Sequence, residues 1–228
     1  TISSQSQQEA IHVMGTPDLK VEQEKTLAAP RMKYDILARM LFLSMDIFYG
    51  RARTLSKFKV LEVIARVPYQ SWEHVAYIAM THTYGEPNFA RRIFNFVSEA
   101  RHQQDNEQWH LLILMEMIQK QGIKEGFLRF RLLPQIIAFT YYHISWLLYV
   151  IRPGLSYHLN ACFEDHAEHE YMEFVRENPH LEDVPFESTF EKDYGSFKSQ
   201  ADLFRRIGLD EREHKEESLA RIEKPRFS

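Results

Sequence analysis

The 228-residue sequence contains one cysteine, Cys162, and few turn-forming residues, with only 8 glycines and 9 prolines. One thiol can form neither an internal disulfide nor a zinc cage made of several cysteines. The small number of glycines and prolines argues against a β-sandwich or β-barrel, whose many short strands need frequent turns. The net charge of −4 lacks the basic excess typical of nucleic-acid binding, so we expect no nucleic acid as a partner.

Hydrophobic residues make up 44% of the chain and charged residues 26%, which supports a sizeable core and excludes wholesale disorder. The length is typical of one domain. We divide the chain into an N-terminal arm (1–30), a helical domain (31–222) and a short C-terminal tail (223–228). The arm is polar, so we expect it to be mobile, and it is consistent with the remainder of a processed targeting segment.

The apolar periodicity predicts helices throughout and no convincing strand, so the predicted fold class is all-α. Breaks are expected at Gly50, at Gly85 to Pro87, near Gly122, and at Pro153-Gly154. A polar stretch from 178 to 196 separates the last two helices. The six predicted helices span 31–49, 56–82, 87–121, 126–151, 154–177 and 199–222.

Two of these segments are unusually apolar. Residues 132–151 contain no Asp, Glu, Lys or Arg, and their length alone would allow a membrane crossing. The segment 34–49 is also apolar, although Asp35, Arg39 and Asp46 give it a polar edge. The alternative for both segments is a buried helix in a soluble bundle.

Glu-x-x-His pairs occur more often than the composition alone predicts, and each pair places an oxygen and a nitrogen on one helix face. Two pairs adjoin apolar runs, which favours an inward orientation. One of the others encloses Pro179 at a helix end, and the remaining one lies among polar residues and is therefore the weaker rival. In order of preference the pairs are Glu107/His110 and Glu211/His214, then Glu99/His102, then Glu177/His180.

Two solitary glutamates, Glu62 and Glu164, lie on helix faces that are otherwise apolar. An unpaired carboxylate there is costly, and metal coordination is one of the few ways to relieve it. Glu62 precedes Glu107 by 45 residues, and Glu164 precedes Glu211 by 47, so each half of the chain repeats one pattern. This pattern is the ligand set of a ferritin-like di-iron carboxylate bundle. Oxygen and imidazole ligands suit iron or manganese.

Four ordered motifs resemble those of the alternative oxidases, and most closely the plastid terminal oxidase branch: LEVIARVPY, NEQWHLLILMEM, YHLNACFEDHAEHEY and LDEREH. The resemblance implies a membrane-associated, non-haem quinol oxidase that holds two iron ions and reduces O2 to water. It also implies that Tyr171 lies near the iron pair and takes part in catalysis. The implied iron ligands are Glu62, Glu107, His110, Glu164, Glu211 and His214.

The third motif indicates in which cellular membrane the protein is expected. Mitochondrial members have Leu-Glu-Glu-Glu-Ala where this chain has residues 163–167, FEDHA. The resemblance therefore favours a plastid, thylakoid or cyanobacterial membrane over the mitochondrial inner membrane.

The resemblance further implies a quinol site between the iron pair and the first apolar helix. The basic residue five positions before the first ligand, usually Arg in this family, is Lys57 here, which keeps the charge but lacks the planar fork. For Arg39 and Asp46 an ordinary surface ion pair is an equal alternative. The candidate quinol-binding residues are Lys57, Leu61, Asp46, Arg39 and His158.

Connectivity predicts a protein that lies on one leaflet. Two of the implied ligand motifs precede residues 132–151 and two follow them, so a single crossing would divide the ligand set between the two sides of the membrane. Both apolar segments are therefore expected in the interface, with Tyr141, Tyr142, Trp146 and Tyr149 at headgroup depth. The remaining faces of the ligand helices are expected to pair two copies in a homodimer.

Two other functions share parts of this pattern. A di-iron hydroxylase of a lipid-soluble substrate would use every ligand, and it would differ by forming a hydroxylated product. A non-catalytic ferritin-like iron-binding protein is disfavoured by the apolar segment at 132–151. Plastoquinol and ubiquinol are both open as substrates.

Overall fold

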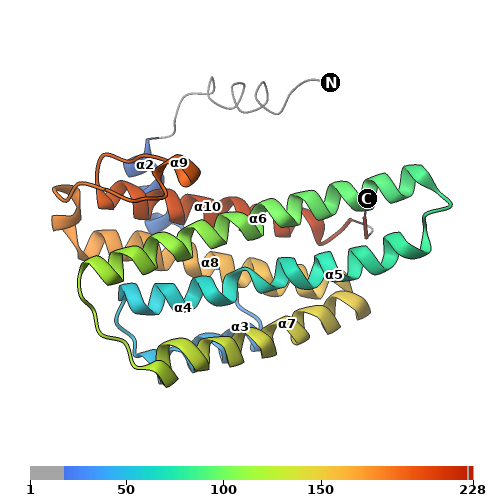
Figure 1. Cartoon of the computed structure of the whole chain (residues 1–228), viewed down its shortest axis with the longest axis horizontal. Coiled ribbons are helices and arrows are strands. Elements are labelled where there is room, and N and C mark those ends of the chain that lie inside the picture. The colour runs from blue at the N-terminus through green and yellow to red at the C-terminus, as the bar shows by residue number, and fades with distance from the viewer. Residues whose placement is uncertain (1–17, 225, 228) are drawn as a thin grey trace.

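The chain folds into layers of helices in the computed structural model, which describes residues 18–224 and 226–227 (Figure 1). Within these residues there are helices and no strand, so the predicted all-α class is confirmed. Two short helical turns, η1 (Leu128–Leu132) and η2 (Pro179–Glu182), accompany the longer elements. These are α2 (Leu19–Ala28), α3 (Ile36–Tyr49), α4 (Leu55–Ala65), α5 (Val67–His82), α6 (Pro87–Lys120), α7 (Leu133–Ile151), α8 (Pro153–Glu177), α9 (Glu191–Tyr194) and α10 (Gln200–Arg221).

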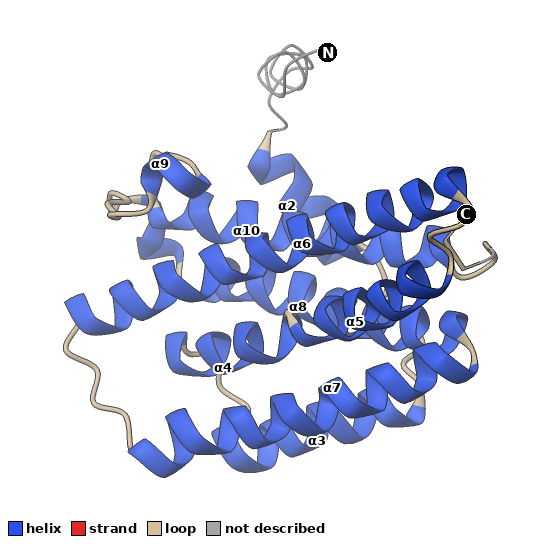
Figure 2. Ribbon diagram, turned by 45° about the vertical axis from the view of Figure 1, so that its right-hand side comes forward, coloured by secondary structure: helices blue, strands red, loops and turns tan. Residues whose placement is uncertain are grey.

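The central bundle consists of α4 with α5, α6, α8 and α10, and α3 and α7 lie along one outer side of it (Figures 1 and 2). Both outer helices press their inner faces onto one apolar cluster, which includes Ala38 and Met45 of α3 and Ala138 and Tyr141 of α7. The bundle thus separates a buried interior from the outward faces of α3 and α7.

The predicted helix 56–82 is two helices in the structure. α4 ends at Ala65, and Pro68 stands in the first turn of α5. Proline has no N–H, and its ring clashes with the preceding turn of a continuous helix, so the axis breaks before it. The break places Tyr69 in the first turn of α5.

The prediction of a mobile arm over residues 1–30 is wrong for the part that the structure describes, and residues 1–17 lie outside it. Residues 19–28 form α2, which packs on α8 and α10. Gln23 is buried and donates to the carbonyl of Met172 at 2.9 Å, and its Oε1 accepts from Arg205 Nε at 2.8 Å. Thr26 donates to Glu168 at 2.6 Å. Polar side chains therefore anchor this helix, which is why its composition suggested a solvated arm.

Residues beyond α10 also contact the bundle. Phe227, in the predicted tail, is buried, and its ring centroid lies 5.5 Å from that of Phe96. Arg226 donates to the carbonyl oxygens of Tyr149 and Val150 at the end of α7.

The aromatic residues of α7 are not placed as predicted. Tyr141 and Tyr149 are 5% and 0% exposed, so they are core residues and their side chains do not contact lipid headgroups. Tyr142 and Trp146 are partly exposed, and the indole of Trp146 donates to His74 at 3.1 Å. Spacings of three and four residues turn Ala138, Tyr141, Ser145 and Tyr149 inward together. Among the helices described, none is both long and apolar enough to cross a membrane.

Candidate metal centre

Four helices each direct acidic side chains to one point inside the bundle. Glu62 comes from α4 and Glu164 from α8, while α6 and α10 each contribute a Glu-x-x-His pair, Glu107/His110 and Glu211/His214. The four carboxylates and His110 are 0% exposed and His214 is 6% exposed. The structure therefore brings together all six side chains that the sequence singled out.

The six residues form two overlapping groups of four, and in each group the ligand atoms lie within 4.8 Å of one another. One group contains Glu62 and His110, the other contains Glu164 and His214, and both contain Glu107 and Glu211. Metal ions in the two groups would share Glu107 and Glu211, because a carboxylate has two oxygens and can bind one ion with each.

The polar atoms of the site fit metal binding because they make no hydrogen bond and lie closest to one another. Sixteen buried side-chain nitrogen or oxygen atoms in the described residues have no hydrogen bond, and eight of them belong to these six residues. His110 Nδ1 lies 3.4 Å from Glu62 and 3.3 Å from Glu211, and His214 Nδ1 lies 2.7 Å from Glu107. Buried polar groups are normally satisfied, so this concentration of unbonded atoms points to a ligand.

Electrostatics leads to the same conclusion. Burial raises the pKa of Glu62 and of Glu164 well above the usual value, and repulsion from Glu107 and Glu211 adds to the shift. Burial also opposes ionisation of Glu107, but the attraction of the two site histidines beside it outweighs burial and lowers its pKa. Without metal the site therefore retains protons on carboxyl groups that metal ions would displace.

Two tyrosines bind the solitary glutamates in a reciprocal arrangement. Tyr171 of α8 donates its hydroxyl to Glu62 of α4, and Tyr69 of α5 donates to Glu164 of α8 at 2.6 Å. Both tyrosines are 0% exposed. Each follows a solitary glutamate by seven residues and reaches the glutamate of the other half. Only Tyr171 was predicted as a site residue, although the same spacing from Glu62 could have identified Tyr69.

A second residue missed by the sequence analysis is Asp210, which orients His110. Its carboxylate accepts from His110 Nε2 at 3.1 Å and from Tyr194 at 2.6 Å, and it pairs with Arg206. A proton on Nε2 leaves the lone pair of Nδ1 directed into the site, as a metal-ligating histidine requires. The signal in the sequence was an aspartate directly before Glu211.

Comparison with known proteins identifies the family at this point. The sequence profile of the alternative oxidases matches residues 21–219. The chain belongs to the alternative oxidase family. This family consists of non-haem di-iron proteins, in agreement with the two overlapping groups of buried ligands.

Two curated relatives come from Arabidopsis thaliana. The chain is 36% identical to "Ubiquinol oxidase 4, chloroplastic/chromoplastic" over 132 residues, which are 58% of this chain and 34% of that protein. It is 24% identical to "Ubiquinol oxidase 2, mitochondrial" over 169 residues, which are 73% of this chain and 44% of that protein. The matches span less than half the length of these relatives, and the plastid-type relative has the higher identity.

The rival Glu-x-x-His pairs lie outside this alternative oxidase site. Glu99 and His102 are exposed on α6, and Glu99 pairs with Arg221. Glu177 forms an ion pair with Arg53 at 2.6 Å at the end of α8. Both glutamates therefore have the ordinary structural role of a helix-surface charge.

A narrow apolar pocket reaches toward the site from α3. Phe42 and Met45 of α3 line it together with Lys57, Phe58 and Leu61 of α4 and with side chains of α8. The rings of Phe58 and Tyr171 are stacked with their centroids 4.3 Å apart, and the Tyr171 hydroxyl in turn donates to Glu62. The pocket thus connects to the candidate ligands through two packed aromatic rings.

The predicted quinol residues divide into two groups. Lys57 and Leu61 line the pocket, and Lys57 Nζ contacts Asp46 Oδ1 at 2.7 Å and the carbonyl of Gly50 at 2.8 Å. Arg39 is exposed on α3, and His158 pairs with Asp35 at 3.1 Å. Neither Arg39 nor His158 is among the residues that line this pocket.

The reciprocal tyrosines make a prediction about metal affinity. Tyr69→Phe keeps the ring but removes the donor that orients Glu164, so one of two Co2+ equivalents should bind about 10–100-fold more weakly. Tyr171→Phe should weaken the other equivalent through Glu62. Calorimetric titration of the metal-free protein with Co2+ measures both affinities. Tyr157→Phe is the control, since the Tyr157 hydroxyl contacts that of Tyr149, 3.3 Å away. Wild-type affinity for both equivalents in Tyr69→Phe would contradict the orienting role.

Proposed function

We propose that this protein is a quinol:oxygen oxidoreductase, which oxidises quinol and reduces O2 to water at a non-haem di-iron centre. The observation that carries the proposal is the buried set of four glutamates and two histidines, in which eight polar atoms lack a hydrogen bond. Membership of the alternative oxidase family supports it, as do the two relatives named ubiquinol oxidases.

The proposed ligands of one iron are Glu62 and His110, those of the other are Glu164 and His214, and Glu107 and Glu211 bridge the two. Bound iron would supply the electron transfer and the binding of O2. The chain holds these donors in a dry interior, where the carboxylates can accept the protons that quinol oxidation releases. We further propose that Tyr171 is catalytic, because its hydroxyl touches an iron ligand and can supply a proton or an electron there.

The quinol ring is proposed to enter the pocket between α3 and α4. Phe42, Met45 and Leu61 provide apolar walls, and the ammonium of Lys57 provides a donor for a quinol oxygen. Asp46 holds this ammonium in place. The path from the pocket to Glu62 then runs through Phe58 and Tyr171.

The test of the function is O2 consumption driven by a soluble quinol, with iron content measured on the same sample. We expect two irons per chain and O2 uptake without a hydroxylated product. Glu211→Ala should abolish uptake, because it removes a carboxylate shared by both metal positions and leaves neighbouring buried charges unbalanced.

The matched control is Glu99→Ala, which alters the exposed Glu-x-x-His pair on α6 and should leave turnover unchanged. A hydroxylated product would instead identify the hydroxylase alternative. Two bound irons without quinol-dependent O2 uptake would exclude the proposed oxidase.

Lys57→Met should raise the quinol KM about tenfold, which corresponds to the loss of one hydrogen bond to a charged group. Iron content should stay at the wild-type value, because Lys57 is not among the six ligands. Steady-state kinetics with varied quinol measures the change, and Lys33→Met, at an exposed position before α3, is the control. An unchanged KM would remove Lys57 from the quinol site.

We also propose that α3 and α7 lie in one leaflet of a membrane. Their outward faces carry apolar side chains that are each more than half exposed, and contiguous exposed apolar surface of this kind is typical of a membrane or partner surface. On α3 these are Ile36, Met40, Leu43 and Ile47, and on α7 they are Ile136, Phe139, Leu147 and Ile151. We call these residues the outer apolar face.

The resemblance of the third motif and the higher identity to the plastid-type relative favour a plastid, thylakoid or cyanobacterial membrane. A homodimer through the free faces of the ligand helices stays a prediction.

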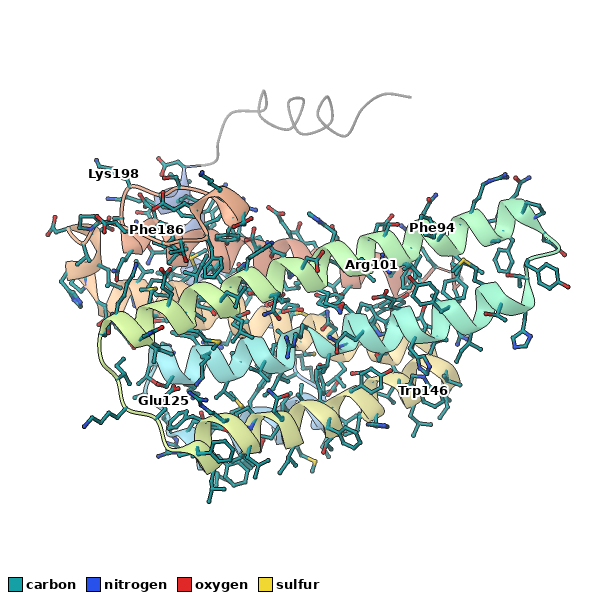
Figure 3. All side chains as sticks on the ribbon, viewed as in Figure 1. Phe94, Arg101, Glu125, Trp146, Phe186 and Lys198 are labelled. Atoms are coloured by element: carbon teal, nitrogen blue, oxygen red, sulfur yellow. The ribbon has the colours of Figure 1, made fainter. Side chains whose placement is uncertain are left out.

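The membrane proposal predicts co-sedimentation of the protein with phospholipid vesicles. The double variant Ile47→Glu and Phe139→Glu places two charges on the outer apolar face and should reduce the bound fraction at least tenfold. Phe94→Glu makes the same kind of change at an exposed position of α6, away from α7, and should bind like the wild type (Figure 3). Equal binding of all three proteins would rule out the outer apolar face as the membrane surface.

A further inference from the structure

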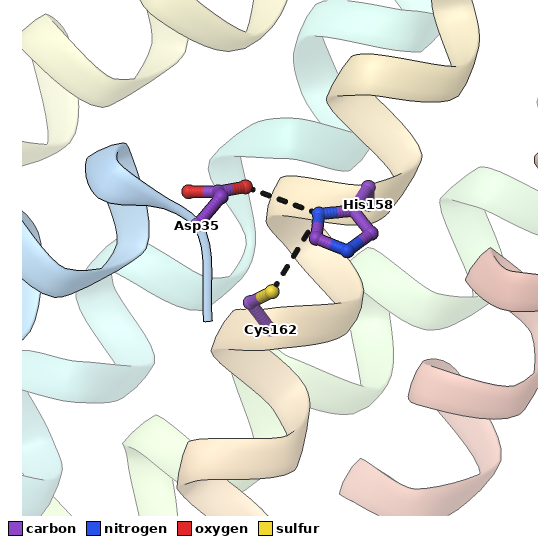
Figure 4. Close-up of side chains that lie close together, drawn as sticks. All are labelled: Asp35, His158 and Cys162. Atoms are coloured by element: carbon purple, nitrogen blue, oxygen red, sulfur yellow. Dashed lines mark hydrogen bonds and ion pairs between the residues drawn. The ribbon is translucent and has the colours of Figure 1, made fainter. Parts of the chain in front are cut away.

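Three potential metal ligands lie together outside the di-iron site, at the junction of α3 and α8 (Figure 4). His158 and Cys162 are one turn apart on α8, and Asp35 precedes the first residue of α3. His158 Nδ1 lies 3.1 Å from Asp35 Oδ2 and 3.7 Å from Cys162 Sγ. One ligand atom of each residue lies within 4.8 Å of the other two.

These separations match the edges of a tetrahedral zinc site. Zinc binds imidazole nitrogen and carboxylate oxygen at about 2.0 Å and thiolate sulfur at about 2.3 Å, so adjacent ligands lie about 3.3 Å apart for N and O, and about 3.5 Å apart for S and N. The observed distances differ from these by a few tenths of an ångström. Small side-chain adjustments would therefore suffice to bind the ion.

The carboxylate of Asp35 is already oriented for this role. Its Oδ1 accepts the backbone N–H of Ala38 at 2.8 Å and caps the first turn of α3, which leaves Oδ2 directed toward His158. Cys162 is fully buried, while the side chains of His158 and Asp35 are 39% and 31% exposed. The thiol thus lies at the buried side of the cluster. Because the other two side chains are partly exposed, a metal ion here could take water as its fourth ligand.

We propose that Asp35, His158 and Cys162 bind one Zn2+ ion, separate from the di-iron centre. On binding, the thiol of Cys162 releases its proton to solvent, so that one thiolate and one carboxylate balance the charge of the ion. A mixed S, N, O set suits zinc better than iron, manganese or calcium. A single cysteine excludes a cage of several thiolates but is compatible with this set.

The bound ion would connect two elements that matter to the pocket. α3 contributes Phe42 and Met45 to the pocket wall, and α8 carries Glu164 two residues after Cys162. In the absence of the ion, the His158–Asp35 contact joins the start of α3 to α8 at this junction. A zinc ion would add a coordinate link and hold the pocket wall in place.

The sharpest test uses Co2+ as the probe on the full chain. Cys162 is the only cysteine, so a thiolate-to-cobalt charge-transfer band in the near ultraviolet can arise only from this cluster, whatever binds at the glutamates and histidines. In protein whose glutamate and histidine site is already loaded with iron, we expect this band to saturate at one Co2+ per chain and to disappear when excess Zn2+ is added.

Three variants complete the test. Cys162→Ser should abolish the band, His158→Gln should weaken it, and Asp35→Asn, which keeps a cap for α3, should lower the affinity at least tenfold. His143→Gln alters an exposed histidine of α7 and should leave the band unchanged. Absence of the band in the wild-type protein would overturn the proposal. So would an affinity for Co2+ that is the same in wild type, Asp35→Asn and His158→Gln.

Discussion

The arrangement of the bundle depends on the burial of four carboxylates at one point. Charges in a low-dielectric interior are tolerated only when ions of opposite sign or protons balance them. Glu62 and Glu164 each use one oxygen to accept a tyrosine hydroxyl, and the second oxygen is left facing the site. Tyrosine hydroxyls are neutral donors and do not balance a carboxylate charge, so cations bound at this centre would stabilise the fold as well as serve the proposed chemistry.

This constraint makes the two halves of the chain equivalent around the site. The tyrosine that follows each solitary glutamate crosses to the glutamate of the other half, so α4 with α5 and α8 are tied together twice. The arrangement is not fully symmetric, because Pro68 interrupts the helix that carries Glu62 and Tyr69, whereas α8 runs unbroken from Glu164 to Tyr171. The two metal positions can therefore differ in the stiffness of their supporting backbone.

The sequence predicted the centre better than its surroundings, for a physical reason. A carboxylate on an apolar helix face has few structural explanations, so Glu62 and Glu164 each indicated a metal site even when taken alone. A helix that is held by buried polar side chains, such as that of Gln23, has the same amino-acid composition as a solvated arm. Only the contacts of these side chains with α8 and α10 distinguish the packed helix from the arm. Arg39 lies outside the pocket for another reason: it directly follows the inward-facing Ala38, and one residue on a helix turns a side chain by about 100°.

The location of the pocket relates the buried centre to the outer apolar face. α3 turns Met45 toward the pocket and Ile47, two residues later, toward the outside. A lipid-soluble substrate that approaches this outer face would therefore have one helix to pass before it meets Lys57 and the ring of Phe58. The proposed membrane surface and the proposed quinol site thus support each other, because each is placed by the two faces of α3.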